Sequence, residues 1–348
     1  MSATHHATGK PPLRTLLVGG GRIGEVHARN TLTQVDGMQL IGVVEPDPSP
    51  SMKAVASGAG IEIVDRPGEL LTSADAVIIA APTDLHEEVL EKAAASGAHI
   101  LCEKPLAADL ASARRMIEAA EKAGIVLQVG FNRRFDHNYR ALRRAVTSGS
   151  LGRVELVRVT SRDPGPPGID YISASGGLFM DMSIHDFDMA RFLTGDEVES
   201  VFARGACLVD DEIGRAGDID TAVVTLRFAS GSLGVVENSR RASYGYDQRA
   251  EIHGSSGTAE SANDTESRVR ISDGNGVHEE KPLHFFLERY RESFICELES
   301  FASAVAGKTQ PEVTGRDGIE AMRIAEACRR SLETGSEVML NDIVNDIV

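Results

Sequence analysis

The sequence predicts an α/β protein with two sheets of different kinds, the first parallel and the second mainly antiparallel. Three observations support this. Up to about residue 130, short apolar segments alternate with helical segments, and a run of three glycines follows the first apolar segment. Beyond that point, strand-like segments follow one another directly. Strands that alternate with helices are typical of a parallel sheet covered on both faces.

The first part of the chain contains six expected strands. They are residues 14–18, 39–44, 61–64, 76–81, 99–102 and 127–131. The most helical segments between them are residues 85–96 and 108–122, and helical character also begins at Ile23, directly after the glycines. This order predicts a parallel sheet that begins with a strand, a glycine turn and a helix.

Period-two alternation of apolar residues marks the second part of the chain. The expected strands are residues 154–160, 198–208, 221–228, 232–238 and 248–253, and the turn at residues 229–231 indicates a hairpin. Two helices are expected at residues 285–305 and 315–334. The repeated NDIV at residues 341–348 is expected to fray rather than to form an element.

Length and charge limit the possible functions. At about 150 residues per domain, the 348 residues correspond to roughly two domains. The composition, 42% apolar and 25% charged, is that of a folded chain. The net charge of −16 and the absence of a basic stripe argue against a nucleic-acid or anionic-membrane partner.

The cysteines and the N-terminus point to a cytoplasmic protein with reduced thiols. The four cysteines lie far apart and form no C-x-x-C pair, which argues against a disulfide framework or a zinc ribbon. Residues 1–12 are polar and are expected to form a flexible tail, neither a signal peptide nor an anchor. No apolar run approaches the roughly 20 residues that span a bilayer, so no membrane partner is expected.

The glycine run is a candidate phosphate-binding turn. Gly19, Gly21 and Gly24 form G-x-G-x-x-G between a strand and a helix, where backbone amides can approach a pyrophosphate. Glu45 ends the second strand 21 residues after Gly24, where a carboxylate would accept hydrogen bonds from a ribose diol and repel a 2′-phosphate. The motif therefore favours NAD over NADP. The alternative is a glycine turn needed only for packing, with Glu45 a solvated acid.

A lysine follows the fifth expected strand. Ligands of open parallel sheets bind beyond the carboxyl ends of the strands, and Lys104 lies at such an end, between Glu103 and Pro105. Its charge could polarise a substrate oxygen; alternatively it is a loop lysine paired with Glu103. After the fourth strand, Ala81, Pro82 and Thr83 either line the nicotinamide or form an ordinary turn.

An acid and a histidine share a predicted helix further along. Asp181, His185 and Asp188 are spaced i, i+4 and i+7, so they would lie on one helix face. A carboxylate there could hold the imidazole in one tautomer, as in a general base with its orienting acid. The alternatives are a structural histidine and a metal site. No second histidine or nearby cysteine completes a zinc set, so no metal is expected.

Several segments together resemble the Gfo/Idh/MocA family of nicotinamide-dependent sugar and polyol oxidoreductases, over nearly the whole chain. The family-wide segments are VGGGRIG, APTDLHEEV, CEKPL, QVGFNRRFD and GGLFMDMSIHDFDMARF. QVGFNRRFD, TSRDP, SGGLFMDMSIHDFDMARFL and SRRASYGYDQRAEIHGSSG more closely resemble the inositol 2-dehydrogenases of that family. The resemblance implies an N-terminal Rossmann domain at 13–132 and a substrate-binding domain at 133–340, whose large open sheet often serves for assembly into a tetramer.

The resemblance also implies roles for single residues. Lys104, Asp181 and His185 match the family's catalytic lysine and D-x-x-x-H pair. The expected cofactor-binding residues are Gly19, Gly21, Arg22, Ile23, Gly24, Glu45, Ala81, Pro82, Thr83, Glu103 and Lys104. Besides the catalytic three, the expected polyol contacts are Arg134, Asp163 and Tyr244 or Tyr246. Glu45 stands where many relatives carry Asp, and Asp163 where some carry Asn, which leaves the preferred stereoisomer open.

The function that follows is NAD-dependent oxidation of a cyclitol ring hydroxyl to a ketone, with myo-inositol giving scyllo-inosose. His185 would take the hydroxyl proton, Asp181 would orient the imidazole, and Lys104 would stabilise the developing alkoxide. The alternatives are a dehydrogenase of scyllo- or D-chiro-inositol, a pyranose dehydrogenase, and a non-catalytic dinucleotide-binding regulator. The presence of all three catalytic residues argues against the regulator.

Overall fold

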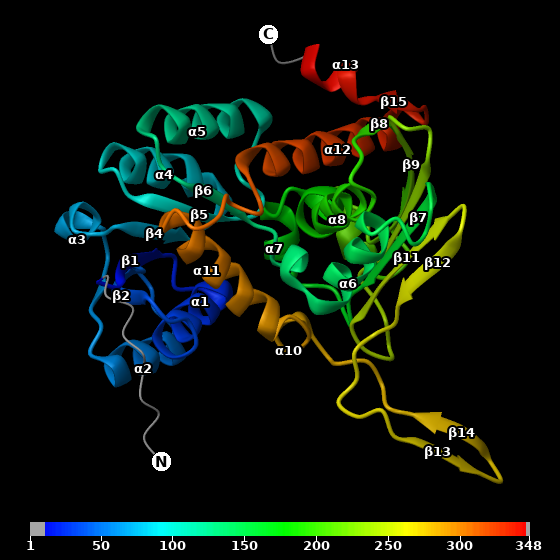
Figure 1. Cartoon of the computed structure of the whole chain (residues 1–348), viewed down its shortest axis with the longest axis horizontal. Helices are drawn as coiled ribbons and strands as arrows, with labels where there is room; N and C mark the ends of the chain where they lie inside the picture. Colours follow the sequence, from blue (N-terminus) through cyan, green and yellow to red (C-terminus); the bar gives the residue numbers. More distant parts are fainter. Residues whose placement is uncertain (1–10, 346–348) are drawn as a thin grey trace. The chain divides into compact units, whose positions relative to one another are not determined.

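The computed structural model describes residues 11–345, which divide into two compact units (Figure 1). The N-terminal unit contains the described residues through Phe131 together with Phe294–Gly318, and the C-terminal unit contains Asn132–Ser293 and the described residues from Ile319 onward. The expected tail at residues 1–10 lies outside the described residues, and Pro11 and Pro12 are exposed. No helix among residues 11–345 combines the length and the apolar character that a membrane span needs.

The N-terminal unit is built on a parallel sheet of six strands in the order β3-β2-β1-β4-β5-β6. The strands are β1 (Leu13–Val18), β2 (Met38–Val44), β3 (Ile63–Val64), β4 (Ala76–Ile79), β5 (His99–Glu103) and β6 (Leu127–Gly130). The connecting helices are α1 (Arg22–Thr33), α2 (Pro50–Ala59), α3 (Gly68–Thr72), the short η1 (Thr83–Leu85), α4 (His86–Ala95) and α5 (Leu110–Ala123). The six strands and their parallel order confirm the sequence prediction.

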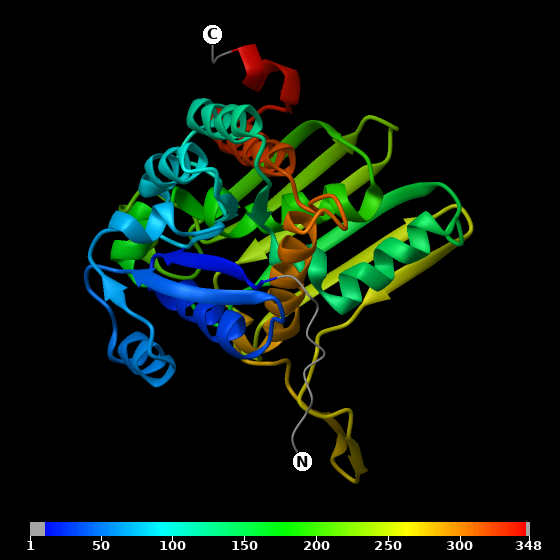
Figure 2. The same cartoon turned by 60° about the vertical axis from the view of Figure 1, so that its left-hand side comes forward.

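Helix α11 (Arg291–Val305) brings the chain back to the N-terminal unit. Its Leu298 and Phe301 are fully buried in one core with Leu17 of β1 and Leu101 of β5. Figure 2 shows the orange α11 beside the blue α1, far apart in the sequence. Burial of two large apolar side chains stabilises the docking by several kcal/mol, of order 1.5–3 each. The chain therefore departs from the expected division into 13–132 and 133–340 at residues 294–318.

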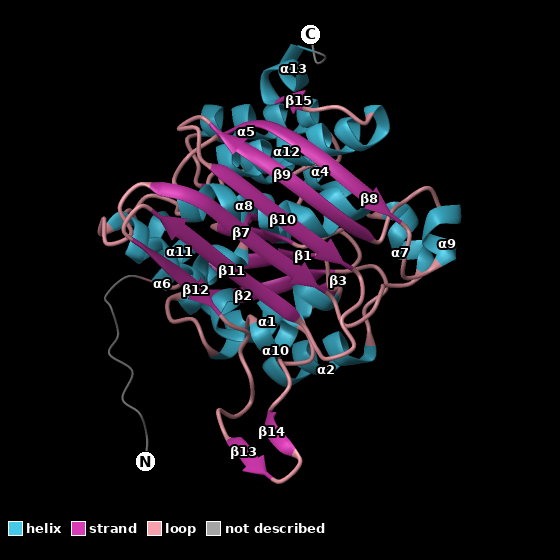
Figure 3. Cartoon of the chain, turned by 90° about the vertical axis from the view of Figure 1, so that its right-hand side faces the viewer, coloured by secondary structure: helices cyan, strands magenta, loops and turns pink. Residues whose placement is uncertain are grey.

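The C-terminal unit contains a sheet of seven strands in the order β12-β11-β7-β10-β9-β8-β15. The strands are β7 (Val154–Arg162), β8 (Val198–Ala206), β9 (Thr221–Phe228), β10 (Leu233–Ser239), β11 (Asp247–Gly254), β12 (Gly257–Ser261) and β15 (Val338–Met339). All pairs are antiparallel except β7 with β10, which run parallel. In Figure 3 one face of this sheet is turned to the viewer, and α6 and α8 lie behind it.

The helical segments of the C-terminal unit include those that carry Asp181 and His185. They are η2 (Asn132–Phe135), α6 (His137–Thr147), α7 (Ile169–Ala174), η3 (Phe179–Ser183), α8 (Ile184–Thr194), α9 (Asp211–Arg215), α10 (Phe286–Arg289), α12 (Gly315–Thr334) and α13 (Leu340–Asn345), of which α12 begins in the N-terminal unit. An exposed hairpin of β13 (Arg270–Asp273) and β14 (Gly276–Glu279) forms a separate sheet.

Three local expectations need correction. The helix expected at 285–305 is two helices, because Tyr290 leaves the helical conformation at the end of α10. The regular helix expected around Asp181 begins with a π-helical turn, η3. The i, i+4, i+7 spacing therefore does not give Asp181 the position on a shared α-helical face that was expected. The expectation that residues 341–348 fray is wrong for 341–345: they belong to α13, which buries Leu340 and Ile343, while 346–348 lie outside the described residues.

Candidate active site

The glycine turn of the N-terminal unit has no room for a side chain at two of the motif's three glycines, Gly19 and Gly24. Gly19 has a φ of +99°, and a Cβ there would overlap the backbone of Ala80. A Cβ on Gly24 would overlap the carbonyl oxygen of Gly19, so the start of α1 packs directly on the turn. No described atom lies within 4 Å of an ideal Cβ at Gly21, the first residue before α1. The turn is therefore tight on one side and open where a helix N-terminus offers its amides.

Glu45 lies against this turn. Its Oε2 accepts a hydrogen bond of 2.7 Å from the amide of Gly20, and its Oε1 accepts one of 3.0 Å from the amide of Asp47. The carboxylate is thus held at the end of β2 beside the glycines. This geometry places a negative charge where the sequence analysis expects a ribose.

Glu103 is the last residue of β5, and Lys104 follows it in a turn that a buried histidine fixes. Nδ1 of His86 lies 3.1 Å from the carbonyl oxygen of Pro105, and Nε2 lies 2.9 Å from that of Ala81. Burial lowers the pKa of His86, while these carbonyl hydrogen bonds oppose the shift. The two expected loops, residues 81–83 and 103–105, are therefore joined through one imidazole.

In the C-terminal unit, Asp181 lies on the π-helical turn and His185 on the first turn of α8. Oδ1 of Asp181 accepts a hydrogen bond of 2.8 Å from the hydroxyl of Tyr171. Its Oδ2 lies 3.3 Å from both terminal nitrogens of Arg240, a side chain that is only 1% exposed. The carboxylate of Asp181 is thus fixed from two sides and faces a buried cation.

Asp163 belongs to the same group of charges. Burial raises its pKa to about 7; Arg240 opposes this shift, and the charge of Asp181 adds to it. Tyr246 is buried, and burial raises the pKa of its phenol, to which Asp163 also contributes. The structure therefore brings Asp163 and Asp181 to Arg240, with Tyr246 in the electrostatic neighbourhood of Asp163.

Arg134 and Tyr244 have partners within the C-terminal unit. Nη2 and Nε of Arg134 donate to the carboxylate of Asp188 at 2.6 and 2.9 Å, and both side chains are buried. Tyr244 is 39% exposed; its hydroxyl donates to Asp247 at 2.6 Å and accepts from Arg162 at 2.9 Å. Of the two alternative tyrosines, Tyr246 is thus the one whose electrostatic neighbours include Asp163.

The two units match the two parts of one enzyme family. Residues 13–131 match an oxidoreductase family with an NAD-binding Rossmann fold, and residues 139–260 match the GFO/IDH/MocA C-terminal domain. The chain belongs to the Gfo/Idh/MocA oxidoreductase family. This membership confirms the resemblance inferred from the sequence motifs, and the NAD-binding fold agrees with the glycine turn.

Curated relatives of this Gfo/Idh/MocA oxidoreductase include cyclitol dehydrogenases. It is 46% identical to the myo-inositol 2-dehydrogenase of Thermotoga maritima, over 95% of this chain and 100% of that protein. It is 42% identical to the inositol 2-dehydrogenase of Rhizobium meliloti, over 93% of this chain and 98% of that protein.

A solved structure of a relative shares the fold over nearly the whole chain. The scyllo-inositol dehydrogenase of Lactobacillus casei, with bound NAD(H) and scyllo-inositol, has a TM-score of 0.88 at 27% identity, over 95% of this chain and 99% of that one.

The glycine turn of this family member fits the NAD for which the family is described. The overlaps at Gly19 and Gly24 leave the turn compact, and the space at Gly21 leaves the amides at the start of α1 accessible. The carboxylate of Glu45 stands beside them. These three features are those that a dinucleotide pyrophosphate and an unphosphorylated ribose need.

The sequence analysis missed several residues that hold the expected site residues in place. In the C-terminal unit these are Tyr171, Asp218 and Arg240, and in the N-terminal unit they are His27, His86 and Glu297. Their contacts join segments far apart in the chain, such as Arg240 and Asp181, which are 59 residues apart. Arg240 lies within SRRASYGYDQ, a segment that the sequence analysis had selected for its tyrosines.

Proposed function

We propose that this protein is an NAD-dependent myo-inositol 2-dehydrogenase that oxidises one ring hydroxyl to the ketone scyllo-inosose. One observation carries the proposal: Asp163 and Asp181 both interact with the buried Arg240, and Tyr246 neighbours Asp163, in the unit that also carries His185. Such a set of donors and acceptors suits a neutral ligand rich in hydroxyls. The 46% identity to a myo-inositol 2-dehydrogenase supports the choice of cyclitol.

His185 would accept the proton of the reacting hydroxyl. Its neighbour on the preceding turn, Asp181, is held by Tyr171 and Arg240, so its negative charge is fixed before substrate arrives. A fixed negative charge stabilises the imidazolium that forms on proton transfer. Lys104 would donate a hydrogen bond to the reacting oxygen and stabilise its developing charge. NAD, held by the glycine turn and Glu45, would supply the hydride acceptor for this oxidation.

Regiochemistry would depend on residues that fix the cyclitol ring, because its hydroxyls are chemically similar. Asp163, with a pKa of about 7, can donate or accept a hydrogen bond to a hydroxyl near neutral pH. Tyr246, an electrostatic neighbour of Asp163, is the proposed second contact to the ring. Arg134, and Tyr244 as the alternative tyrosine, remain proposed substrate contacts, with Asp188 and Asp247 as their present partners.

The same proposal covers the cofactor contacts and the assembly. The pyrophosphate would be held by the glycine turn, which consists of Gly19, Gly21, Arg22, Ile23 and Gly24. Glu45 would bind the ribose, and residues 81–83 and 103–104 would line the nicotinamide.

We further propose a homotetramer in the cytoplasm. The uncovered sheet face exposes Val223 and Leu233, at 46% and 53%, and such apolar side chains suit an interface between copies. The four cysteines form no disulfide in the described part of the chain, which fits a reducing compartment.

The test follows NADH absorbance with the purified protein, NAD or NADP, and a panel of myo-, scyllo- and D-chiro-inositol, glucose and xylose. We expect selective NADH formation with myo-inositol and NAD. Preference for scyllo-inositol would move the assignment to the second candidate, which the similarity to the L. casei enzyme favours. Activity on a pyranose alone would overturn the cyclitol assignment, and NAD binding without turnover on any substrate would indicate a regulator.

A matched variant tests the mechanism. His185→Ala should lower kcat roughly 10²-fold or more at all pH values, because a general base contributes at least that much. NAD binding, measured by fluorescence titration, should stay within about twofold of wild type, because the NAD-binding Rossmann fold lies in the N-terminal unit. Near-native turnover of the variant would refute the assignment of His185.

A further inference from the structure

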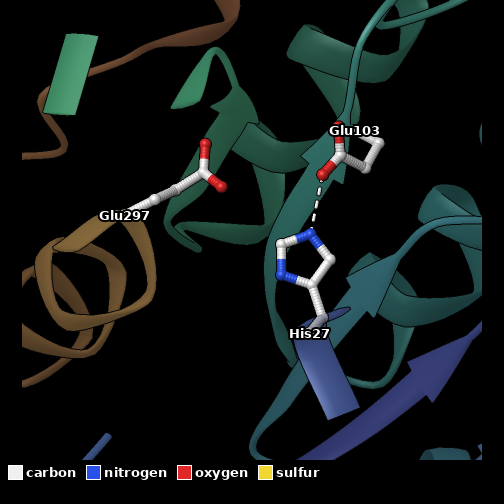
Figure 4. A group of neighbouring side chains, drawn as sticks. All are labelled: His27, Glu103 and Glu297. Carbon is white, nitrogen blue, oxygen red and sulfur yellow. Dashed lines mark hydrogen bonds and ion pairs between the residues drawn. The ribbon is translucent and has the colours of Figure 1, made fainter. Parts of the chain in front are cut away.

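Two buried side chains of the N-terminal unit meet the partly buried side chain of Glu103, the residue before Lys104. Figure 4 shows them: His27 comes from α1, Glu103 ends β5, and Glu297 comes from α11. One donor atom of each lies within 4.8 Å of the others. The mechanism proposed above uses neither His27 nor Glu297, and Glu103 immediately precedes Lys104 in the sequence.

The carboxylate of Glu103 occupies a built position. Nε2 of His27, which is fully buried, lies 2.6 Å from Oε1 of Glu103, a hydrogen bond that the imidazole donates to the carboxylate. On the other side, Gly130 of β6 makes room for the second oxygen: a Cβ there would lie 2.8 Å from Oε2. His27 also packs edge-on against Phe294, at 6.0 Å between ring centroids, which fixes its orientation.

Glu297 faces this pair from α11. It is 0% exposed, and neither oxygen of its carboxyl group has a hydrogen-bond partner among residues 11–345. A buried carboxyl group without a partner favours its neutral form. Burial raises its pKa well above the ordinary value, and the charge of Glu103 raises it further. The titratable groups facing it are His27 from α1 and Glu103 from β5, and β6 contributes the uncharged amide of Gln128, which donates to the Glu297 carbonyl at 3.0 Å.

The geometry suits protons better than a metal ion. A tetrahedral zinc site with ligand bonds of about 2.0 Å would hold its ligand atoms roughly 3.3 Å apart. His27 and Glu103 lie 2.6 Å apart, the distance of a direct hydrogen bond. An ion would therefore have to separate a pair that is already satisfied.

We propose that His27 and Glu297 are positioning residues for Lys104, which act by holding the Glu103 carboxylate as the single negative charge of the triad His27, Glu103 and Glu297. The inference rests on the proposed function for the role of Lys104. His27 fixes Glu103 by its hydrogen bond, and Glu297 contributes a carboxyl group without a second charge. On the far side of Lys104, His86 fixes Pro105. The lysine thus extends from a turn that is held on both sides.

Kinetic variants test this role. His27→Phe keeps the ring packing against Phe294 but removes the hydrogen bond, so we expect kcat to fall about tenfold to a hundredfold, as misplacement of a catalytic group does. KM for NAD should change much less than kcat. His27→Gln, which can still donate to Glu103, should recover most of the lost kcat. Glu297→Ala should lose kcat as His27→Phe does, and Glu297→Gln, an uncharged isostere, should recover it.

Further controls separate positioning from folding. Glu299→Gln changes an exposed acid two residues further along α11 and should leave kcat unchanged. Wild type should lose kcat at high pH as Glu297 ionises, and Glu297→Gln should lack that loss. Circular dichroism and the thermal midpoint verify that each variant is folded.

Two measurements need no turnover. The infrared carbonyl band of a protonated carboxylic acid should be present in wild type at pH 8 and lost in Glu297→Gln. Reductive ¹³C-methylation with NMR should give a Lys104 methyl resonance whose chemical shift changes in His27→Phe and returns in His27→Gln. These readouts decide the proposal even if no cyclitol is oxidised, an outcome that would refute the proposed function alone.

Three results would overturn the positioning role. The first is that both His27→Phe and Glu297→Ala keep the kcat of wild type and an unchanged Lys104 methyl resonance. The second is a Glu297→Gln variant as impaired as Glu297→Ala, which would mean that the ionised carboxylate is needed. The third is stoichiometric zinc bound to the purified protein that is lost in Glu297→Gln, which would make the triad a metal site.

Discussion

Buried carboxylates in the two units differ in what faces them. In the C-terminal unit, Asp136, Asp186 and Asp188 each accept hydrogen bonds from a buried arginine, at distances between 2.5 and 2.6 Å for the shortest contact. In the N-terminal unit, Glu297 faces a histidine and the carboxylate of Glu103 instead. The three aspartates are compensated by fixed positive charge, whereas burial and the charge of Glu103 favour the protonated form of Glu297 by raising its pKa.

The difference determines how each unit responds to mutation and to pH. Arginine stays protonated under all ordinary conditions, so its ion pairs respond little to pH but strongly to the loss of either partner. A neutral acid such as Glu297 keeps its neutrality only below its raised pKa. The arginine–aspartate pairs should therefore respond mainly to substitution, and the Glu297 site to pH.

The largest expected effect is at Arg133. Its Nη1 donates to Asp186 at 2.6 Å, and the two side chains are 4% and 0% exposed. Arg133→Met should lower the free energy of unfolding by about 3–5 kcal/mol, because it leaves a buried carboxylate without its cation. The double variant Arg133→Met/Asp186→Asn should recover part of that loss in urea unfolding. Equal losses in the single and double variants would contradict the comparison.

The second effect is a pH-dependent difference in stability at Glu297. Its folded-state pKa is raised, so the native state keeps a proton that the unfolded state loses above its ordinary pKa. Wild-type stability should fall as pH rises from about 4.5 through the folded pKa, by up to about 1.4 kcal/mol per pH unit. Glu297→Gln lacks this term. Urea unfolding at pH 5, 6.5 and 8 should show the variant gaining on wild type, and a constant gap would contradict the raised pKa.

A smaller effect is expected at Asp163, an acid of the C-terminal unit with a pKa of about 7. Asp163→Asn offers a hydroxyl similar hydrogen bonds but cannot ionise. We expect KM for the cyclitol to change roughly fivefold, which corresponds to about 1 kcal/mol for one hydrogen bond. The profile of log kcat/KM against pH should lose an inflection near 7 that wild type has. An inflection of equal size in the variant would assign it to another group, such as His185.

The smallest effect is expected for the exposed Glu299. Glu299→Gln should change the free energy of unfolding by less than about 0.5 kcal/mol at every pH, because surface substitutions away from special contacts are nearly neutral. It is the matched control for Glu297→Gln, since both remove a carboxylate from α11. A pH-dependent difference as large as that of Glu297→Gln would show that the effect is not specific to burial.

Local sequence signals were sufficient for the features that depend on near neighbours. The six parallel strands follow from apolar runs of strand length, and the turn at Gly19 and Gly24 follows from spacing that only glycines satisfy. The helix over Gly315–Thr334 has the expected bounds because its apolar residues repeat at helical spacing. The family motifs added the roles expected of Lys104, Asp181 and His185.

Features that depend on distant partners were not accessible from such signals. The amphipathic pattern of α11 predicts a buried face but does not say that Leu298 and Phe301 fill the core of the first sheet. The hairpin of β13 and β14 is exposed, and each of its four-residue strands has a single large apolar residue, Ile271 or Val277, which is too short a pattern to identify a strand. Nothing in the local sequence marks Arg240 as buried, and its partner Asp181 lies 59 residues away in the chain.

The return of α11 to the first sheet has a consequence for inheritance. The chain leaves the N-terminal unit after Phe131, re-enters it at Phe294 and leaves it again after Gly318. A contiguous gene fragment ending at residue 131 would encode the six strands without Leu298 and Phe301, and its translated product would present bare apolar surface to water. Recombination that exchanges one unit for another must therefore cut at three places rather than one, so the two halves of this enzyme are expected to be transmitted together.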